Sequence, residues 1–139
     1  MKARKVKKLD PAGTLAENAA RIVIVRIDEL RGFAAGALEP DASATQHDMR
    51  IAAKRLRYVL EVTGACFGPE ADAARRVAKD LQGVLGEIHD CDVMLPKVAG
   101  IGSLESLLRT RRELLFARFV GLWGSGEARD AFSRLSRAL

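Results

Sequence analysis

The chain has 139 residues, 48% of them hydrophobic and 29% charged, values that fit one globular domain and exclude compositional disorder. Lys and Arg number 23 against 18 Asp and Glu, and the formal net charge of +5 favours a polyanionic partner such as nucleic acid, a phosphate polymer or a membrane surface. No apolar run is long enough to span a membrane, and an aromatic content of 5% disfavours stacking platforms for single-stranded nucleic acid.

Residues 1–9 are basic and lead into Asp10-Pro11 rather than into an apolar segment. We therefore expect a flexible basic tail and no signal peptide, followed by a single helical domain over residues 10–139. The two cysteines form neither a CxxC pair nor a disulfide framework, which favours a reducing, cytoplasmic location.

Apolar residues recur at the helical period, whereas strand signals are almost absent. The first predicted helix runs from about Thr14 to Leu38, begins with a capping box of Thr14 and Glu17, and ends before Pro40. The others are expected at about 43–66, 69–98, 103–123 and 127–138. Short connections make neighbouring helices antiparallel, so the predicted fold class is all-α: an antiparallel helical bundle of four long helices plus a short C-terminal helix.

The second predicted helix carries a row of basic side chains opposite its apolar face. At about 100° per residue these side chains fall within an arc of roughly 80°. The basic row consists of His47, Arg50, Lys54 and Arg57. Arg55 flanks it, and Glu61 lies four residues after Arg57, where the two side chains can pair. Like charges this close repel one another, and a bound polyanion would relieve the repulsion. A solvated surface face is the alternative interpretation.

The third predicted helix has a matching, less charged face that contains Arg75, Lys79, Gln82, Gly86 and His89. Gly83 and Gly86 lie inside this helix, where each glycine costs about 1 kcal/mol relative to alanine. Such a cost indicates that something approaches the backbone closely. The approaching group can be either a ligand or a neighbouring helix.

Asp92 falls at the edge of the apolar face of the third helix, where a carboxylate needs a partner. Arg26 lies within the apolar stripe of the first helix, and Arg111 and Arg118 lie at the margin of that of the fourth. We expect these arginines either to pair with acids or to point into a shared polar groove. For Asp92 the expected partner is Arg111 or Arg118.

The sequence contains few catalytic motifs. Phosphate-binding glycine loops are absent from the sequence. His47, His89, Asp90 and Asp92 could serve a metal-dependent phosphohydrolase, but the nearby cationic side chains would repel a divalent ion. We therefore predict no metal and no cofactor, and the hydrolase stays an alternative.

The stretch from His47 to Tyr58, HDMRIAAKRLRY, resembles the signature helix of the CHAD family, named for a conserved histidine α-helical domain. The family pattern is His-x-x-Arg-apolar-x-x-Lys/Arg-Arg-apolar-Arg, and every position is met. Leu81 to Gly86 and the acidic stretch Asp90 to Val93 resemble a second family feature. The resemblance covers about residues 45–98.

This resemblance implies an all-helical protein that binds inorganic polyphosphate through a basic groove, often on polyphosphate granules. We predict a binding protein rather than an enzyme. The resemblance implies as binding residues His47, Arg50, Lys54, Arg55 and Arg57, and more weakly His89. Further basic candidates near the expected groove are Arg75, Lys79, Arg111 and Arg118. The alternatives are a metal-dependent phosphohydrolase and a nucleic-acid-binding helical module, the latter disfavoured.

The family unit has two similar four-helix halves with a basic channel between them, and this chain is long enough for one half. We therefore expect a homodimer that rebuilds the channel; the alternative is a single copy that binds in a shallower groove. Two cationic rows repel each other, so association must come from apolar surface elsewhere. The predicted association surface consists of Phe116, Phe119, Trp123 and Phe132.

Overall fold

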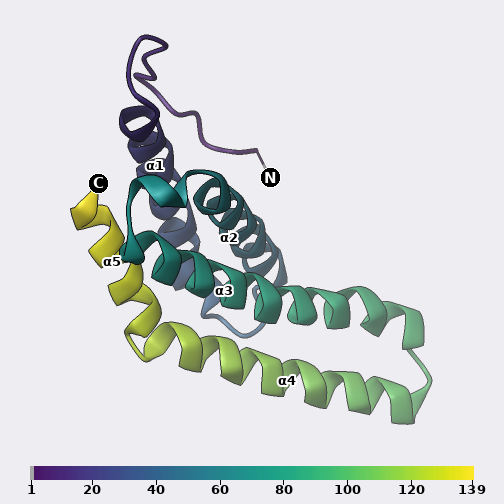
Figure 1. Ribbon diagram of the computed structural model, residues 1–139. Helices are drawn as coiled ribbons and strands as arrows, with labels where there is room; N and C mark the ends of the chain where they lie inside the picture. The colour runs from purple at the N-terminus through teal and green to yellow at the C-terminus, as the bar shows by residue number, and fades with distance from the viewer. Residues whose placement is uncertain (1) are drawn as a thin grey trace.

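The computed structural model describes residues 2–139, and within that range the backbone forms helices joined by short turns (Figure 1). The α-helices are α1 (Leu15–Ala37), α2 (Ser43–Thr63), α3 (Pro69–Met94), α4 (Gly102–Gly124) and α5 (Glu127–Ala138). Two short 3-10 segments, Gly64–Cys66 and Leu95–Val98, follow α2 and α3. The predicted all-α bundle of four long helices and a short fifth is confirmed.

Local signals in the sequence account for the helix ends. Thr14 caps α1: its hydroxyl accepts a hydrogen bond from the Glu17 N–H at 3.1 Å, and the Glu17 carboxylate accepts one from the Thr14 N–H at 3.2 Å. The predicted capping box is therefore confirmed. Gly68, before α3, has a φ of +73°, which glycine adopts without the steric cost that a side chain would bring.

The helices are packed unevenly (Figure 1). Consecutive helices α1, α2 and α3 lie against one another, and both α4 and α5 pack on α3. The ends of α3 and α4 that meet near residue 100 extend beyond α1 and α2 as a two-helix projection (Figure 1). One face of α4 is therefore left without a neighbouring helix.

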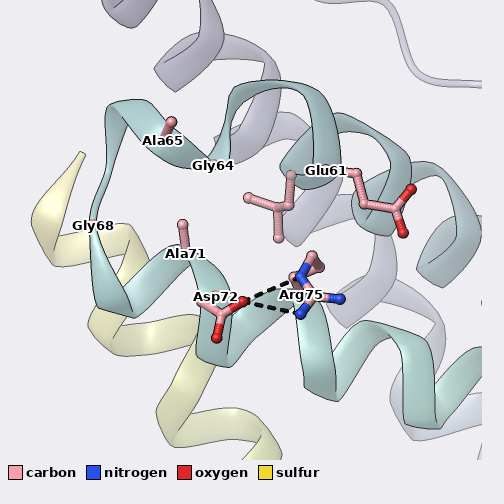
Figure 2. A pocket seen from close by; sticks show the side chains of 8 residues that line it. Glu61, Gly64, Ala65, Gly68, Ala71, Asp72 and Arg75 are labelled. Atoms are coloured by element: carbon pink, nitrogen blue, oxygen red, sulfur yellow. Dashed lines mark hydrogen bonds and ion pairs between the residues drawn. The ribbon is translucent and has the colours of Figure 1, made fainter.

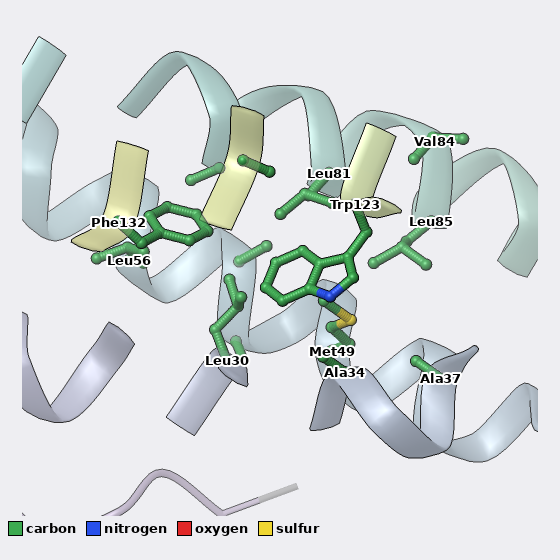
Figure 3. Packing of buried hydrophobic residues seen from close by; sticks show 14 of the residues in the cluster. Leu30, Ala34, Ala37, Met49, Leu56, Leu81, Val84, Leu85, Trp123 and Phe132 are labelled. Atoms are coloured by element: carbon green, nitrogen blue, oxygen red, sulfur yellow. The ribbon is translucent and has the colours of Figure 1, made fainter. Parts of the chain in front are cut away.

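The hydrophobic core lies where all five helices converge (Figure 3). Its large side chains include Leu30, Leu56, Leu81, Trp123 and Phe132 (Figure 3). Phe119 and Phe132 are fully buried, and Trp123 is 6% exposed.

The predicted association surface is therefore wrong. Phe119, Trp123 and Phe132 belong to the core, and Phe116 is partly buried against it. The physical reason is that the final helix folds back onto α3, so the aromatic residues near the C-terminus are covered by the chain itself.

A buried carboxylate links the N-terminal segment to the bundle. Glu29 is 1% exposed and accepts hydrogen bonds from Arg26 at 3.3 Å, from Arg55 at 3.1 Å and from the Arg4 N–H at 2.7 Å. Arg26 thus pairs with an acid of its own helix, one of the two arrangements expected for it. Met1 lies outside the described residues, and the flexibility of the basic tail stays a prediction.

Candidate functional site

The basic row of α2 faces α3 and forms one wall of a groove of about 410 Å³. Two members of the row, Arg50 and Arg57, line this groove together with Lys79 and His89 of α3. The full lining is Arg50, Arg57, Lys79, Gln82, Gly83, Gly86, Glu87, His89 and Asp90. The structure thus brings together four of the ten predicted binding residues in one groove.

The periodicity of α2 explains this placement. Its buried residues, including Met49, Ala53 and Leu56, fix the rotation of the helix, so the opposite edge carries the basic side chains toward α3. A Cβ at Gly86 would make an ordinary van der Waals contact, 3.7 Å from Arg50 Cδ. A Cβ at Gly83 would meet nothing within 4 Å, so this glycine leaves the groove open. The close approach expected at these two glycines is therefore seen at neither position.

Three buried polar atoms in the groove have no hydrogen-bond partner among the described residues. They are Arg50 Nε, Arg57 Nε and Gln82 Oε1. Arg57 Nε lies 3.4 Å from Glu61 Oε1, within ion-pair range, so the predicted pairing of these side chains is present. A buried donor without a partner costs about 1–3 kcal/mol. Both arginines also line the groove, where their guanidinium groups can donate to an anionic oxygen.

The two histidines stack on each other at the end of the groove. The ring centroids of His47 and His89 are 4.3 Å apart, and Arg50 Nη2 lies 3.5 Å from His47 Nδ1. Burial lowers the pKa of His47 below its ordinary value, and the adjacent His89 and Arg50 lower it further. His47 is therefore neutral at neutral pH and becomes a third cationic group beside the arginines when protonated.

Lys54, the remaining member of the basic row, is exposed and lies over the Tyr58 ring, 5.7 Å from its centroid. The Arg57 guanidinium lies 4.7 Å from the same centroid. Tyr58 thus holds two cationic side chains on one side of α2 by cation–π contacts.

A second groove on α3 joins the first. It is lined by Lys79, Gly83, Glu87 and Arg118 among others, and the first three of these residues also line the groove beside α2. The surface is therefore continuous from Arg50 across α3 at Gly83 to α4. Glu87 carries a negative charge within it, but Arg111 pairs with this carboxylate at 3.2 Å.

Three predicted binding residues are held by acidic side chains and line neither groove: Arg111, which pairs with Glu87, and two others. Arg55 contacts the buried Glu29 at 3.1 Å and faces α1. Arg75 lies at the end of the bundle near the α2–α3 turn, where its guanidinium makes two hydrogen bonds to Asp72 (Figure 2). The structure does not bring any of these three side chains into the groove.

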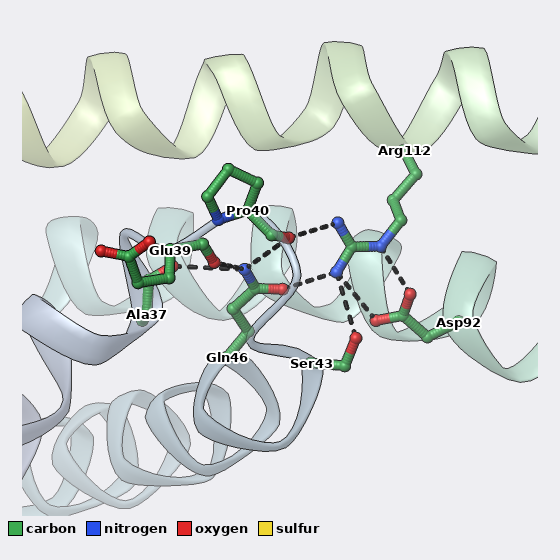
Figure 4. A network of polar contacts seen from close by, with 7 residues as sticks. All are labelled: Ala37, Glu39, Pro40, Ser43, Gln46, Asp92 and Arg112. Atoms are coloured by element: carbon green, nitrogen blue, oxygen red, sulfur yellow. Dashed lines mark hydrogen bonds and ion pairs between the residues drawn. The ribbon is translucent and has the colours of Figure 1, made fainter.

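The predicted partner of Asp92 is wrong. Asp92 pairs with Arg112, at 2.5 Å from its Nε and 3.3 Å from its Nη2, and not with Arg111 or Arg118 (Figure 4). Arg112 follows Arg111 directly in the sequence. It therefore lies on a different side of α4, the side that faces the turn between α1 and α2.

Arg112 also binds that turn. Its guanidinium donates to the Pro40 carbonyl at 2.9 Å, to Gln46 Oε1 at 2.7 Å and to the Ser43 hydroxyl at 3.3 Å (Figure 4). Gln46, which is 1% exposed, donates in turn to the carbonyls of Ala37 and Glu39. The network therefore ties α4 to the start of α2 and has a structural role.

Sequence reasoning placed Gln82 on the matching face of the third helix but not among the binding residues, and it missed Arg112 as an internal partner. The signal for Gln82 was present, because it shares the helical face of Lys79 and His89. No comparable signal distinguished Arg112, because it is one of four arginines on α4.

Two features of the described residues bear on the alternatives. Among residues 2–139, no group of three or more His, Cys, Asp or Glu side chains is placed to hold a metal ion. Within the same residues, every helix is either too short or too polar to cross a membrane.

Comparisons with known proteins give one match. A family model described as the CHAD domain matches residues 2–99. The matched region contains α1, α2, α3 and hence the groove between α2 and α3, whereas α4 and α5 lie beyond it. No curated protein and no solved structure matches the chain.

Proposed function

The chain belongs to the CHAD family, known for binding polyphosphate, and from this premise we propose that the protein binds inorganic polyphosphate in the groove between α2 and α3 without hydrolysing it. One observation carries the proposal. Two half-buried arginines, Arg50 and Arg57, line the groove, and the buried Nε atom of each has no hydrogen-bond partner among the described residues, although Arg57 Nε lies within ion-pair range of Glu61. Phosphate oxygens are the acceptors that such groups bind most strongly.

The shape of the groove suits a linear polyanion. Beyond the arginines the surface continues past Lys79 and Gly83 to Arg118. In the proposed complex, successive phosphates lie along this path and displace condensed counterions, as on nucleic acids. The contacts go to phosphate oxygens alone and need no base.

Titration with polyphosphates of defined length tests the function. We expect affinity to rise with chain length from pyrophosphate upward, because longer chains reach more of the path. Duplex DNA at the same phosphate concentration and salt should not displace a long polyphosphate. DNA that competes equally well would favour the nucleic-acid module. Release of orthophosphate that requires Mg²⁺ or Mn²⁺ would favour the phosphohydrolase.

The affinity for polyphosphate should depend on pH through His47. A bound polyanion favours the imidazolium form, so binding raises the pKa of His47 from its lowered value and takes up a proton. Affinity should therefore increase as the pH falls from 8 through the usual histidine range near 6.5. The affinity should level off once the pH is below the lowered pKa that His47 has in the free protein. Isothermal titration with a long polyphosphate, which has few titrating end groups, measures this.

The control for the pH effect is His47→Gln, which retains His89, the only other histidine. This variant should bind with a weaker dependence on pH. An unchanged pH profile would show that His47 does not lie beside the bound polyphosphate.

Two finer features belong to the same proposal. Association with polyphosphate granules would follow from binding, because granules present the polymer at high local density. We also propose that the protein is a homodimer, for which a different surface from the predicted one is available.

A further inference from the structure

Helix α4 is apolar on two opposite sides. Its inner side contributes Leu115, Phe119 and Trp123 to the core. On its outer side, Leu107 and Leu114 are 63% and 65% exposed. A helix that is apolar around its circumference is normally covered on all sides. Within residues 2–139, no element covers the outer side of α4.

The central residues of the outer side are small or apolar, with Leu107 and Leu114 the two large ones, so a second helix can pack closely against them. These central residues follow one another at alternating intervals of four and three, directly opposite the core-facing residues. They are Ser103, Leu107, Thr110, Leu114, Ala117 and Gly121. In heptad terms Leu107, Leu114 and Gly121 occupy a positions, and Ser103, Thr110 and Ala117 occupy d positions. We call these six residues the α4 seam.

The charges beside the α4 seam select one occupant and one orientation. Arg118 lies at an e position and Glu113 at a g position. Neither has an ion pair or side-chain hydrogen bond within the described chain, whereas Arg111, the other arginine on the e side, is paired with Glu87.

In a parallel pair of helices, a g residue lies beside the e residue of the following heptad of its partner, and these charges set partner and orientation. Glu113 of one copy would meet Arg118 of the other, twice by symmetry. An antiparallel pair would instead bring arginine toward arginine.

We propose that two copies of this chain associate through the α4 seam as parallel, two-fold-related helices. Leu107 and Leu114 then pack against their counterparts, and Glu113 pairs with Arg118 of the second copy. A closed two-fold contact needs only this self-complementary surface. The interface does not require polyphosphate, so it can be tested separately from the proposed function.

Sedimentation velocity of the full chain over a range of concentrations, without polyphosphate, tests the association. The unmodified protein should show a concentration-dependent dimer. Leu114→Glu should weaken self-association at least about tenfold, because it places a charge in the apolar centre of the seam. Leu114 is exposed, so circular dichroism should show unchanged helix content. A strict monomer, or a dimer insensitive to Leu114→Glu, would overturn the proposal.

A charge exchange tests the orientation. Arg118→Glu and Glu113→Arg should each weaken the dimer, because each single change opposes like charges. The double variant should restore it. In a Cys66→Ser background, Thr110→Cys should oxidise to a covalent dimer, since d positions of parallel helices face each other. Failure of the double variant to recover, or no cross-link at residue 110, would overturn the parallel arrangement.

Discussion

Replacing Arg50, Arg57 and Lys79 together by alanine removes three contacts and is expected to weaken polyphosphate binding by about 1,000-fold or more. Each charge-assisted hydrogen bond contributes about 1.5–3 kcal/mol, and about 1.4 kcal/mol corresponds to a tenfold change in affinity. Alanine is a good helix former, so α2 and α3 should keep their helix content. Titration with a long polyphosphate, together with circular dichroism of the same samples, measures both quantities.

A matched control separates local contacts from net charge. Arg129, Arg134 and Arg137 lie on α5, are exposed and do not line the groove. Their triple alanine variant also loses three positive charges, as the groove variant does. It should bind polyphosphate with an affinity within a few-fold of that of the unmodified protein. Equal losses in the two triple variants would mean that net charge, and not the groove, determines binding.

The salt dependence gives a second measure of the same contacts. Affinity should fall steeply with salt, and the slope of log affinity against log salt should decrease by about 0.7 for each phosphate contact removed. The groove variant should therefore show a slope shallower by about 2, while the α5 variant keeps the original slope. A flat salt dependence of the unmodified protein would contradict an electrostatic site.

Arg112→Ala is expected to lower the free energy of unfolding by about 3 kcal/mol. Arg112 and Asp92 are 14% and 21% exposed, and the guanidinium also binds Pro40, Ser43 and Gln46. Removing one partner of a buried pair costs about 3–5 kcal/mol, and the residual solvent contact places this pair at the lower end. Urea unfolding followed by circular dichroism measures the change.

Arg111→Ala is the matched control for this prediction, because it removes a neighbouring arginine of the same helix. Its ion pair with Glu87 joins side chains that are 55% and 44% exposed, so its loss should cost about 0–1 kcal/mol. Similar losses of stability in the two variants would contradict a special role for the Arg112 network. If Arg112→Ala left stability unchanged but abolished polyphosphate binding, Asp92 and Arg112 would belong to the binding site.

Several features of this protein could be predicted from residues close together in the sequence. The capping box at Thr14, the glycine before α3 and the basic row of α2 depend on neighbours within about one helical turn. The apolar periodicity of α2 also indicated which of its sides is buried, because one side has Met49 and Leu56 and the other has Arg50 and Arg57. The helices and the basic row were therefore predictable.

The partners across helices were decided by the tertiary structure. Arg111 and Arg112 differ by about 100° in rotation around α4, and the sequence does not say which neighbouring element lies on either side. The bundle places Glu87 on one side and Asp92 with the α1–α2 turn on the other. Arg55 pairs with Glu29 for the same reason, because α1 occupies that side of α2.

The clearest difference concerns the aromatic residues near the C-terminus. Their hydrophobicity indicated correctly that these residues are buried. The sequence does not show, however, whether α5 of the same chain or a second copy of the chain buries them. The fold-back of α5 onto α3 covers Phe119, Trp123 and Phe132 and leaves Leu107 and Leu114 exposed instead. Periodicity determined which residues avoid water, whereas the long-range packing of the helices determined which of them the chain itself covers.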